Sequence, residues 1–390
     1  MEERQEKRFE MDMCSGPIMK KMLMFAIPLV CSSVLQLLFN AADIVVVGRF
    51  AGDNSLAAVG SNTALINLLT NLFIGLSVGV NVLTGLCYGA KQEKDLTETV
   101  HTAMLLSLFS GLFLMVGGII SAHVLLNWMQ APQEVIGLAT LYLRIYFVGM
   151  PAVMVYNFGS AILRAVGDTR RPLFYLTGAG IINVILNLFF VVVCRLDVAG
   201  VALATVISET VSGGLVFRCL MKEKGGIRLI PSKLHIYRDK LQKILRIGLP
   251  AGFQGIVFAL SNVLIQSSVN IFGATIVAGN SAAANIEGFV YVSMNAFHQA
   301  TVSFTSQNMG AGKYERINRI LFCGEICAIV VGLVMGNACV IFGNSLLGVY
   351  SSSPEVIQAG LVRLRVIAAT YALCGMMDVV CGSVRGLGSS

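Results

Sequence analysis

The sequence predicts an all-α polytopic membrane protein with two pseudo-symmetric six-helix bundles, the second of which stops after four helices. Three observations predict this class: the composition, a series of long apolar runs and an internal repeat. Of the 390 residues, 56% are hydrophobic and 13% are charged, and the mean hydropathy is +0.77. An average soluble protein carries about 25% charged residues. This chain has more apolar surface than a soluble core could bury, so it is expected to contact lipid.

Ten apolar runs recur along the chain, and each is long enough to cross a hydrocarbon layer of about 30 Å as a helix. Unpaired backbone groups are costly in lipid, and the runs lack the alternating pattern of strands, so helices are expected. The predicted spans are residues 23–47, 56–88, 99–121, 136–163, 173–194, 199–221, 244–269, 281–308, 320–343 and 356–384.

An internal repeat divides these spans into two units. A shift of 221 residues aligns YGAK at 88–91 with MGAG at 309–312, and RAVG at 164–167 with RGLG at 385–388. Six spans precede the second unit, so both units begin in the same orientation and an axis along the membrane normal should relate them. Subtraction from the repeat period predicts that about 60 residues, which correspond to the last two spans, are missing. The predicted parts are a tail (1–22), an N-terminal lobe (23–221), a basic linker (222–243) and a C-terminal lobe (244–390).

The basic residues indicate the orientation of the protein. The net charge is +7, and 21 of the 28 Lys and Arg lie in loops on one side, against two, Arg49 and Arg195, in the opposite loops. The positive-inside rule therefore predicts a cell-membrane protein with a cytoplasmic N-terminus. The tail mixes five basic and five acidic residues without a cleavage pattern, so a solvated segment is expected and not a signal peptide. The expected partners are membrane lipids and a small molecule, with no nucleic acid and no obligate protein partner.

The first span contains a carboxylate within an apolar run. Gln36, Asn40 and Asp43 fall at i, i+4 and i+7, on one helical face. A charge at bilayer depth costs at least about 2.5–3.5 kcal/mol, so Asp43 should face the bundle interior and have partners. Burial penalises the charged form, which suits a group that binds and releases a proton. Pro28 interrupts the same helix and predicts a hinge, although a static kink explains it equally well.

Polar residues on two other spans could surround Asp43. Asn183 and Asn187 lie one turn apart on the fifth span, and Thr205 and Glu209 lie one turn apart on the sixth. Together they predict a hydrated pocket inside the first bundle. The alternative is that they are interhelical hydrogen bonds, worth about 0.6 kcal/mol each.

The eighth span carries a second polar face, formed by Glu287, Tyr291 and His298. This face predicts either a second coupling site or the lining of a substrate cleft. Glu287 could instead lie near the outer surface, and His298 taken alone is better explained as a packing residue.

Catalytic motifs do not fit the chain. GAGKY at 310–314 lacks the upstream glycine of a phosphate loop and the Ser or Thr after Lys313, and HExxH and GxSxG are absent. The longest internal loop, about 22 residues, leaves no room for a nucleotide-binding domain. Cys323 and Cys327 lack the partners of a zinc site. We therefore expect no enzyme, no cofactor and no metal site, apart from a possible Na⁺ at Asp43.

The motifs together resemble the multidrug and toxic compound extrusion (MATE) family of cation-coupled antiporters from residue 17 onward. Pro28 and Asp43 fifteen residues apart carry the resemblance, together with the GAK and GAG turns, ILRAVGDTRRP (162–172), its echo SVRGLGSS (383–390) and INVILN (182–187). The family implies twelve helices in two lobes around a V-shaped cleft. It also implies that Asp43, Asn183, Asn187 and Thr205 form an ion-responsive pocket, with Asn187 where several relatives carry a second Asp.

The expected function is secondary antiport: export of organic cations, drugs or lipophilic metabolites in exchange for H⁺ or Na⁺. A single carboxylate with amide neighbours suits either ion. One alternative is a lipid-linked precursor flippase of the same superfamily. Such proteins usually place several cationic residues in the cleft, and Arg144 and Arg365 are too few, which disfavours this alternative without excluding it. Another alternative is a non-transporting receptor or assembly protein, for which a repeat that builds a cleft would be unneeded.

Overall fold

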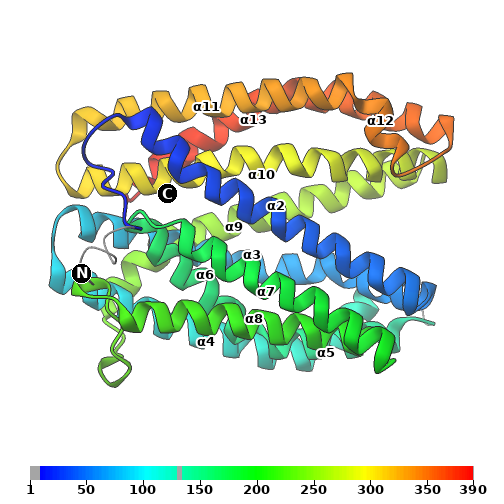
Figure 1. Ribbon diagram of the computed structural model, residues 1–390, viewed down its shortest axis with the longest axis horizontal. Helices are drawn as coiled ribbons and strands as arrows, with labels where there is room; N and C mark the ends of the chain where they lie inside the picture. Colours follow the sequence, from blue (N-terminus) through cyan, green and yellow to red (C-terminus); the bar gives the residue numbers. More distant parts are fainter. Residues whose placement is uncertain (1–8, 130–133, 390) are drawn as a thin grey trace.

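A computed structural model describes residues 9–129 and 134–389, and this part of the chain is helical and contains no strand (Figure 1). The predicted all-α class is confirmed. The helices of the first half are α2 (Ile18–Phe50), α3 (Asp53–Gly89), α4 (Glu93–Trp128), α5 (Ile136–Val148), α6 (Met150–Ala165), α7 (Arg170–Leu188), the π-helix η1 (Phe189–Val193) and α8 (Asp197–Lys222). After the short turns η2 (Gly225–Ile227) and η3 (Pro231–Lys233) come α9 (Arg238–Asn270), α10 (Ala274–Gly310), α11 (Tyr314–Ile341), α12 (Gly343–Gly348) and α13 (Pro354–Gly386).

Each predicted span overlaps one of these helices or one pair of them. Within the described residues, seven helices are long and apolar enough to cross a membrane, or up to nine if each of two bent pairs is one span. The helix α10, which contains the predicted span 281–308, is not among them. Its many amide and hydroxyl side chains lower its hydropathy, and most of them are buried against other helices.

Two spans predicted as single helices are bent. The fourth, 136–163, bends by 48° between α5 and α6, where Pro151 occupies the first turn of α6. The tenth bends by 45° between the segments Pro354–Ala368 and Thr370–Gly386, although no proline lies there. These bends lie at equivalent positions of the repeat. A proline accompanies only one of the two bends. The bend therefore belongs to this position of the repeat and does not require proline.

The backbone repeats with the same period as the sequence. Three pairs of residues with positive φ are each 221 positions apart: Gly52 (85°) and Gly273 (90°), Lys91 (56°) and Gly312 (68°), Gly167 (98°) and Gly388 (87°). A left-handed residue favours a sharp reversal of the chain, so the same turns follow the same helices in both halves.

The first helix of each repeat packs on the second helix of the other. The helix α2 crosses between the halves and contacts α10 as well as α7, and α9 runs along α3 (Figure 1). Small residues allow α3 and α9 to approach closely, since a Cβ added to Gly75 would lie 2.3 Å from the Cα of Gly252. The halves are therefore joined by backbone contact as well as by side chains.

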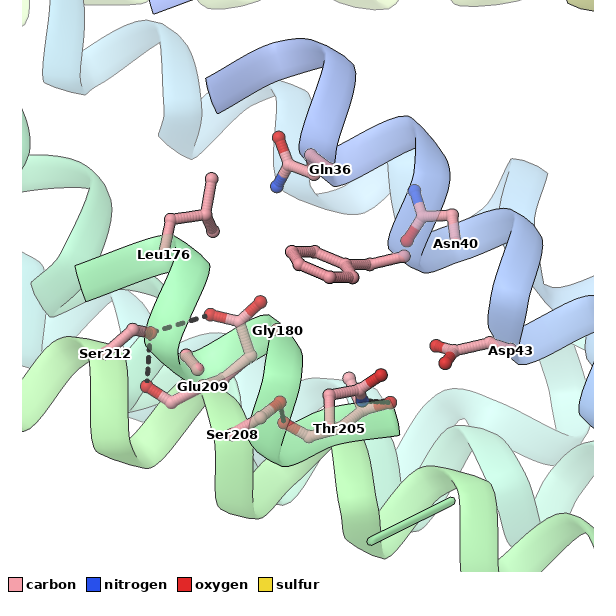
Figure 2. A pocket seen from close by; sticks show the side chains of 12 residues that line it. Gln36, Asn40, Asp43, Leu176, Gly180, Thr205, Ser208, Glu209 and Ser212 are labelled. Atoms are coloured by element: carbon pink, nitrogen blue, oxygen red, sulfur yellow. Dashed lines mark hydrogen bonds between the residues drawn. The ribbon is translucent and has the colours of Figure 1, made fainter. Parts of the chain in front are cut away.

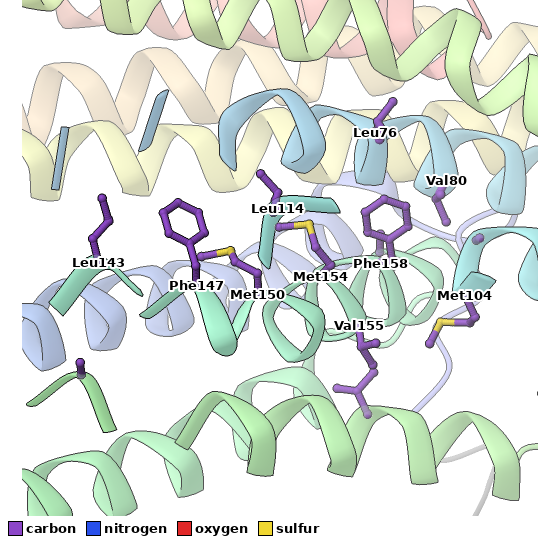
Figure 3. Packing of buried hydrophobic residues seen from close by; sticks show 14 of the residues in the cluster. Leu76, Val80, Met104, Leu114, Leu143, Phe147, Met150, Met154, Val155 and Phe158 are labelled. Atoms are coloured by element: carbon purple, nitrogen blue, oxygen red, sulfur yellow. The ribbon is translucent and has the colours of Figure 1, made fainter. Parts of the chain in front are cut away.

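The core of the first half is apolar and closely packed. Phe147, Met150, Met154 and Phe158 project from α5 and α6 toward α3 and α4 and are fully buried (Figure 3). On the outer face of α4, in contrast, Phe113 is 68% exposed. Large apolar side chains on the outside as well as the inside are typical of helices surrounded by lipid.

The predicted solvated tail is only partly correct. Residues 1–8 lie outside the described part of the chain, and α2 already begins at Ile18. Residues 9–17, which we call the tail strap, pack between helix ends, and Met13 is fully buried. That prediction was based on charge alone. The apolar side chains of Phe9, Met11 and Met13 favour packing against the protein over exposure to water.

The tail strap contacts both halves of the molecule. On the first half, the Arg171 guanidinium lies 5.6 Å from the centre of the Phe9 ring, and the Tyr88 hydroxyl donates a 3.2 Å hydrogen bond to Glu10. On the second half, Asn308 Nδ2 donates to the Met13 carbonyl at 3.1 Å and Lys313 Nζ donates to the Cys14 carbonyl at 2.8 Å.

Candidate functional site

A cavity of about 60 Å³ lies between α2, α7 and α8, and we call it the α2/α7/α8 pocket (Figure 2). Twelve residues line it: Gln36, Phe39, Asn40, Asp43, Leu176, Ala179, Gly180, Asn183, Thr205, Ser208, Glu209 and Ser212. The cavity contains two carboxylates, several amides and hydroxyls, and one apolar wall. Six of the residues predicted from the sequence therefore lie around one space.

The helix α2 supplies one wall of the pocket. The side chains of Gln36, Asn40 and Asp43 all point from α2 toward α7 and α8 (Figure 2). Gln36 and Asn40 are exposed, and Asp43 is partly buried. The helical spacing that identified this face in the sequence also places it on the pocket.

A hydrogen-bonded chain connects Asp43 with the other two helices. Asn187 donates to the Asp43 carboxylate and, at 3.2 Å, to the Asn183 side-chain oxygen. Asn183 in turn donates to the Thr205 hydroxyl at 3.4 Å, and Thr205 donates to the Val201 carbonyl at 3.0 Å. The side-chain oxygen of Asn187 is buried and has no hydrogen-bond partner in the described residues. The structure thus brings together Asp43, Asn183, Asn187 and Thr205.

The pocket carboxylates lack cationic partners. No Lys, Arg or His of the described chain forms an ion pair with Asp43 or Glu209. Asp43 is held by an amide, and Glu209 accepts one long hydrogen bond, 3.4 Å, from Ser212. A cation that enters the pocket therefore meets two carboxyl groups that no cationic side chain of the described residues pairs with.

The predicted residues of the second half do not share one environment. Glu287 is 3% exposed, and both of its carboxylate oxygens accept hydrogen bonds of 2.8–3.1 Å from Arg363. Tyr291 is exposed. His298 is buried, and its ring nitrogen is 2.6 Å from the backbone carbonyl of Asp378, which agrees with the packing interpretation.

Sequence reasoning missed several residues of these two regions, and three of them carried a signal that could have been used. Arg363 was overlooked, although a cation inside a predicted span signals a buried acidic partner. Phe39 and Ser208 follow Gln36 and Thr205 by three residues, so helical spacing alone could have placed both on the pocket. The Phe39 ring lies against Gly180, where an added Cβ would be 1.9 Å from it. Glycine at 180 is therefore needed for this aromatic side chain to fit.

The described residues do not form a typical site for a transition metal. In residues 9–129 and 134–389, no three or more His, Cys, Asp or Glu side chains are grouped to hold a metal ion. The oxygens near Asp43 are instead one carboxylate with amide and hydroxyl groups.

Comparison with known proteins identifies the family. The profile of the MatE family matches residues 28–189 and 250–390. The chain belongs to the MATE family. The resemblance found in the sequence is confirmed, and membership makes the chain a multi-pass membrane transporter of small molecules.

Three similar proteins illustrate the range of the MATE family. Probable multidrug resistance protein YoeA of Bacillus subtilis is 27% identical over 396 residues, which cover 100% of this chain and 86% of that protein. The FAD transporter of Shewanella oneidensis is 24% identical over 369 residues, 94% of this chain and 81% of that protein. A solved structure of a multidrug resistance MATE transporter in an outward-facing conformation has a TM-score of 0.90 at 23% identity, over 96% of this chain and 84% of that one.

Proposed function

We propose that this MATE transporter is a secondary antiporter of the cell membrane with a cytoplasmic N-terminus. It exports organic cations, drugs or lipophilic metabolites in exchange for H⁺ or Na⁺, and Asp43 binds the coupling ion. One observation carries the proposal: a carboxylate inside the membrane helices is held by an amide and has no cationic partner in the described chain. Such a group is costly to place in the membrane, so its presence favours a role in transport.

An amide partner suits a carboxyl group that changes its charge. The amino group of Asn187 donates to ionised Asp43, and after rotation of the amide its oxygen can accept from protonated Asp43. That oxygen is buried without another partner in the described residues. Asp43 can therefore gain a proton and keep its hydrogen bond.

The same residues fit Na⁺ by the type of their atoms. Asp43 offers carboxylate oxygens, Asn183 and Asn187 offer amide oxygens, and Thr205 offers a hydroxyl. Oxygen ligands of this kind suit hard cations. The coupling ion neutralises Asp43 in either case, and this removes the cost of moving a charge when the helices rearrange.

Pro28 is the proposed hinge for that rearrangement. The helix α2 is continuous from Ile18 to Phe50 and includes Pro28, which has no N–H to donate to the preceding turn. A bend at this point breaks fewer hydrogen bonds than a bend elsewhere in α2. Because α2 contacts both α7 and α10, it would transmit a change at Asp43 to the other half.

The test is efflux of ethidium from vesicles under an imposed pH gradient or an imposed Na⁺ gradient, one at a time. The wild type should respond to one of them, and Asp43→Asn should lose that response because it cannot exchange charge. Asp197→Asn, at the exposed first residue of α8, is the matched control. Equal gradient-driven rates in the wild type and Asp43→Asn would contradict the proposal.

The two alternatives gain no support from the structure. A lipid-linked precursor flippase would need cationic residues at its binding site, but Arg144 and Arg365 are exposed and do not line the α2/α7/α8 pocket. A non-transporting receptor does not fit membership of a transporter family. The relatives named for drugs and for FAD carry different cargo, so ethidium serves as a general cationic probe.

A further inference from the structure

The α2/α7/α8 pocket contains a second carboxylate, Glu209, which the coupling mechanism above does not use. Glu209 lies midway along α8, which runs from Asp197 to Lys222. A charge is most costly at the centre of a membrane helix, and ionisable residues there usually serve a function. The position of Glu209 therefore needs an explanation of its own.

The contacts of Glu209 leave its charge available. The Ser212 hydroxyl is 3.4 Å from the carboxylate and 2.9 Å from the backbone carbonyl of Glu209, so it is shared between the two. No cation of the described chain pairs with Glu209. In Figure 2 the carboxylate points across the pocket toward α2, on the side of Gln36 and away from Asp43.

Glu209 and Asp43 occupy different levels of the same pocket. Thr205 belongs to the hydrogen-bonded chain of Asp43, and Glu209 lies one helical turn, about 6 Å, further along α8. The two carboxylates share no hydrogen-bond partner among the described residues. The two sites are close enough to influence each other and far enough apart to bind separate cations.

The surroundings of Glu209 suit a cation attached to an apolar body. Leu176, Ala179 and Phe39 form the apolar wall of the pocket, and an aromatic ring attracts a nearby cation through its face. A volume of about 60 Å³ accepts the charged head group of a larger molecule, not the whole molecule. Neighbouring apolar side chains also make an unscreened charge pair stronger than it would be in water.

We propose that Glu209 is the counter-anion for the positively charged group of the transported substrate, and so selects organic cations over neutral molecules. The proposal rests on the antiport function: Glu209 recognises the substrate, and Asp43 binds the coupling ion at the next level. It also assigns to α8 a role in specificity that is separate from its contribution to the hydrogen-bonded chain of Asp43.

The test is equilibrium binding to the purified protein in detergent, without a gradient. Ethidium is the cationic probe and Nile red is the neutral apolar probe, each titrated by fluorescence anisotropy. Glu209→Gln keeps the shape of the side chain and removes its charge, so the Kd for ethidium should rise about tenfold or more while that for Nile red stays within about twofold. Glu209→Asp, which keeps the charge, should remain closer to the wild type.

Thr210→Ala, an exposed neighbour on α8, is the control and should bind both probes as the wild type does. An unchanged Kd for ethidium in Glu209→Gln would overturn the proposal, and so would an equal loss of both probes, which would mark a structural role. A different result would contradict the antiport function alone. In that case wild-type vesicles would show no gradient-driven efflux, while the charge at position 209 would still control ethidium binding.

Discussion

Asp43 in the first half and Glu287 in the second are both carboxylates within long helices, but their partners differ. Asp43 accepts a hydrogen bond from the amide of Asn187, whereas Glu287 is bound through both oxygens by Arg363, which also donates to Asn280 at 2.6 Å. A permanent cation stabilises a carboxylate in one charge state, and an amide tolerates both. The two halves therefore hold buried acids differently: Glu287 joins two helices through an ion pair, whereas Asp43 has the amide partner expected of the ion-binding group proposed above.

The repeat shows that the ion pair is a unit. At the shift of 221 residues, Glu287 corresponds to Ile66 and Arg363 to Tyr142. Both charges are present in the second half and both are absent from the first. Since a single unpaired charge there would be costly, the two positions have to change together. Glu287 lies on α10 and Arg363 on α13, so the pair joins these helices.

The largest expected effect comes from breaking that pair. Arg363→Met leaves Glu287 buried without a partner and should lower the free energy of unfolding by about 3–5 kcal/mol. The measurement is thermal unfolding in detergent. The double variant Glu287→Met with Arg363→Met replaces both charges by apolar groups and should recover most of the loss. If Arg363→Met were as stable as the wild type, the ion pair would have no structural role and the proposed difference between the halves would be wrong.

A smaller effect should follow from placing a cation beside Asp43. Thr205→Lys directs an ammonium into the α2/α7/α8 pocket, where it would compete with the coupling ion. An interaction of about 1.4 kcal/mol already corresponds to a tenfold loss of ion affinity, so gradient-driven ethidium efflux should fall by at least about that factor. Thr205→Met has the same reach without the charge and separates volume from electrostatics. Loss of activity in both variants to the same extent would contradict a role for the charge.

The smallest expected effect concerns the tail strap, which contacts both halves and carries titratable groups outside the helices that span the membrane. Burial raises the pKa of Glu10, whose neighbours are Tyr88, Arg171, Asp168 and Glu223. In the undocked tail Glu10 titrates near its usual value of about 4.3. Docking should therefore strengthen as the pH falls through the raised pKa, and gain nothing further below about 4.3.

Asp12 sets the lower end of the pH range in which the tail strap is most stably docked. Its hydrogen bond with Ser15 lowers its pKa, so its contribution to docking is present above its usual value and is lost only in stronger acid. Hydrogen exchange of residues 9–16 between pH 4.5 and 7 measures the effect. Glu10→Gln should remove the pH dependence, and a dependence that persists in this variant would assign it to another group.

The sequence was sufficient for features that depend on one helix. Length and hydropathy located the spans, and helical spacing placed Gln36, Asn40 and Asp43 on one face, as the structure does. The repeat anticipated the backbone turns at Lys91 and Gly312. Each of these features follows from the periodicity of one helix or from the similarity of the two repeats. Neither requires knowledge of how the helices pack.

Features that depend on packing between distant segments could not be derived in this way. Glu287 and Arg363 are 76 residues apart, and spacing within one helix does not say which other helix its charged face meets. The bend after Ala368 has no proline to mark it. The tail was judged by its charges, but its burial is set by a gap between helix ends that exists only after the helices have assembled.

The tail strap has a consequence for biosynthesis. Residues 9–17 leave the ribosome about 300 residues before Asn308 and Lys313, two groups that hold them. At a synthesis rate of about 5–20 residues per second, the strap waits some 15 to 60 seconds for these partners. The tail strap therefore completes its docking only after α10 and the turn that follows it have been made, so its docking reports that the two halves are in contact.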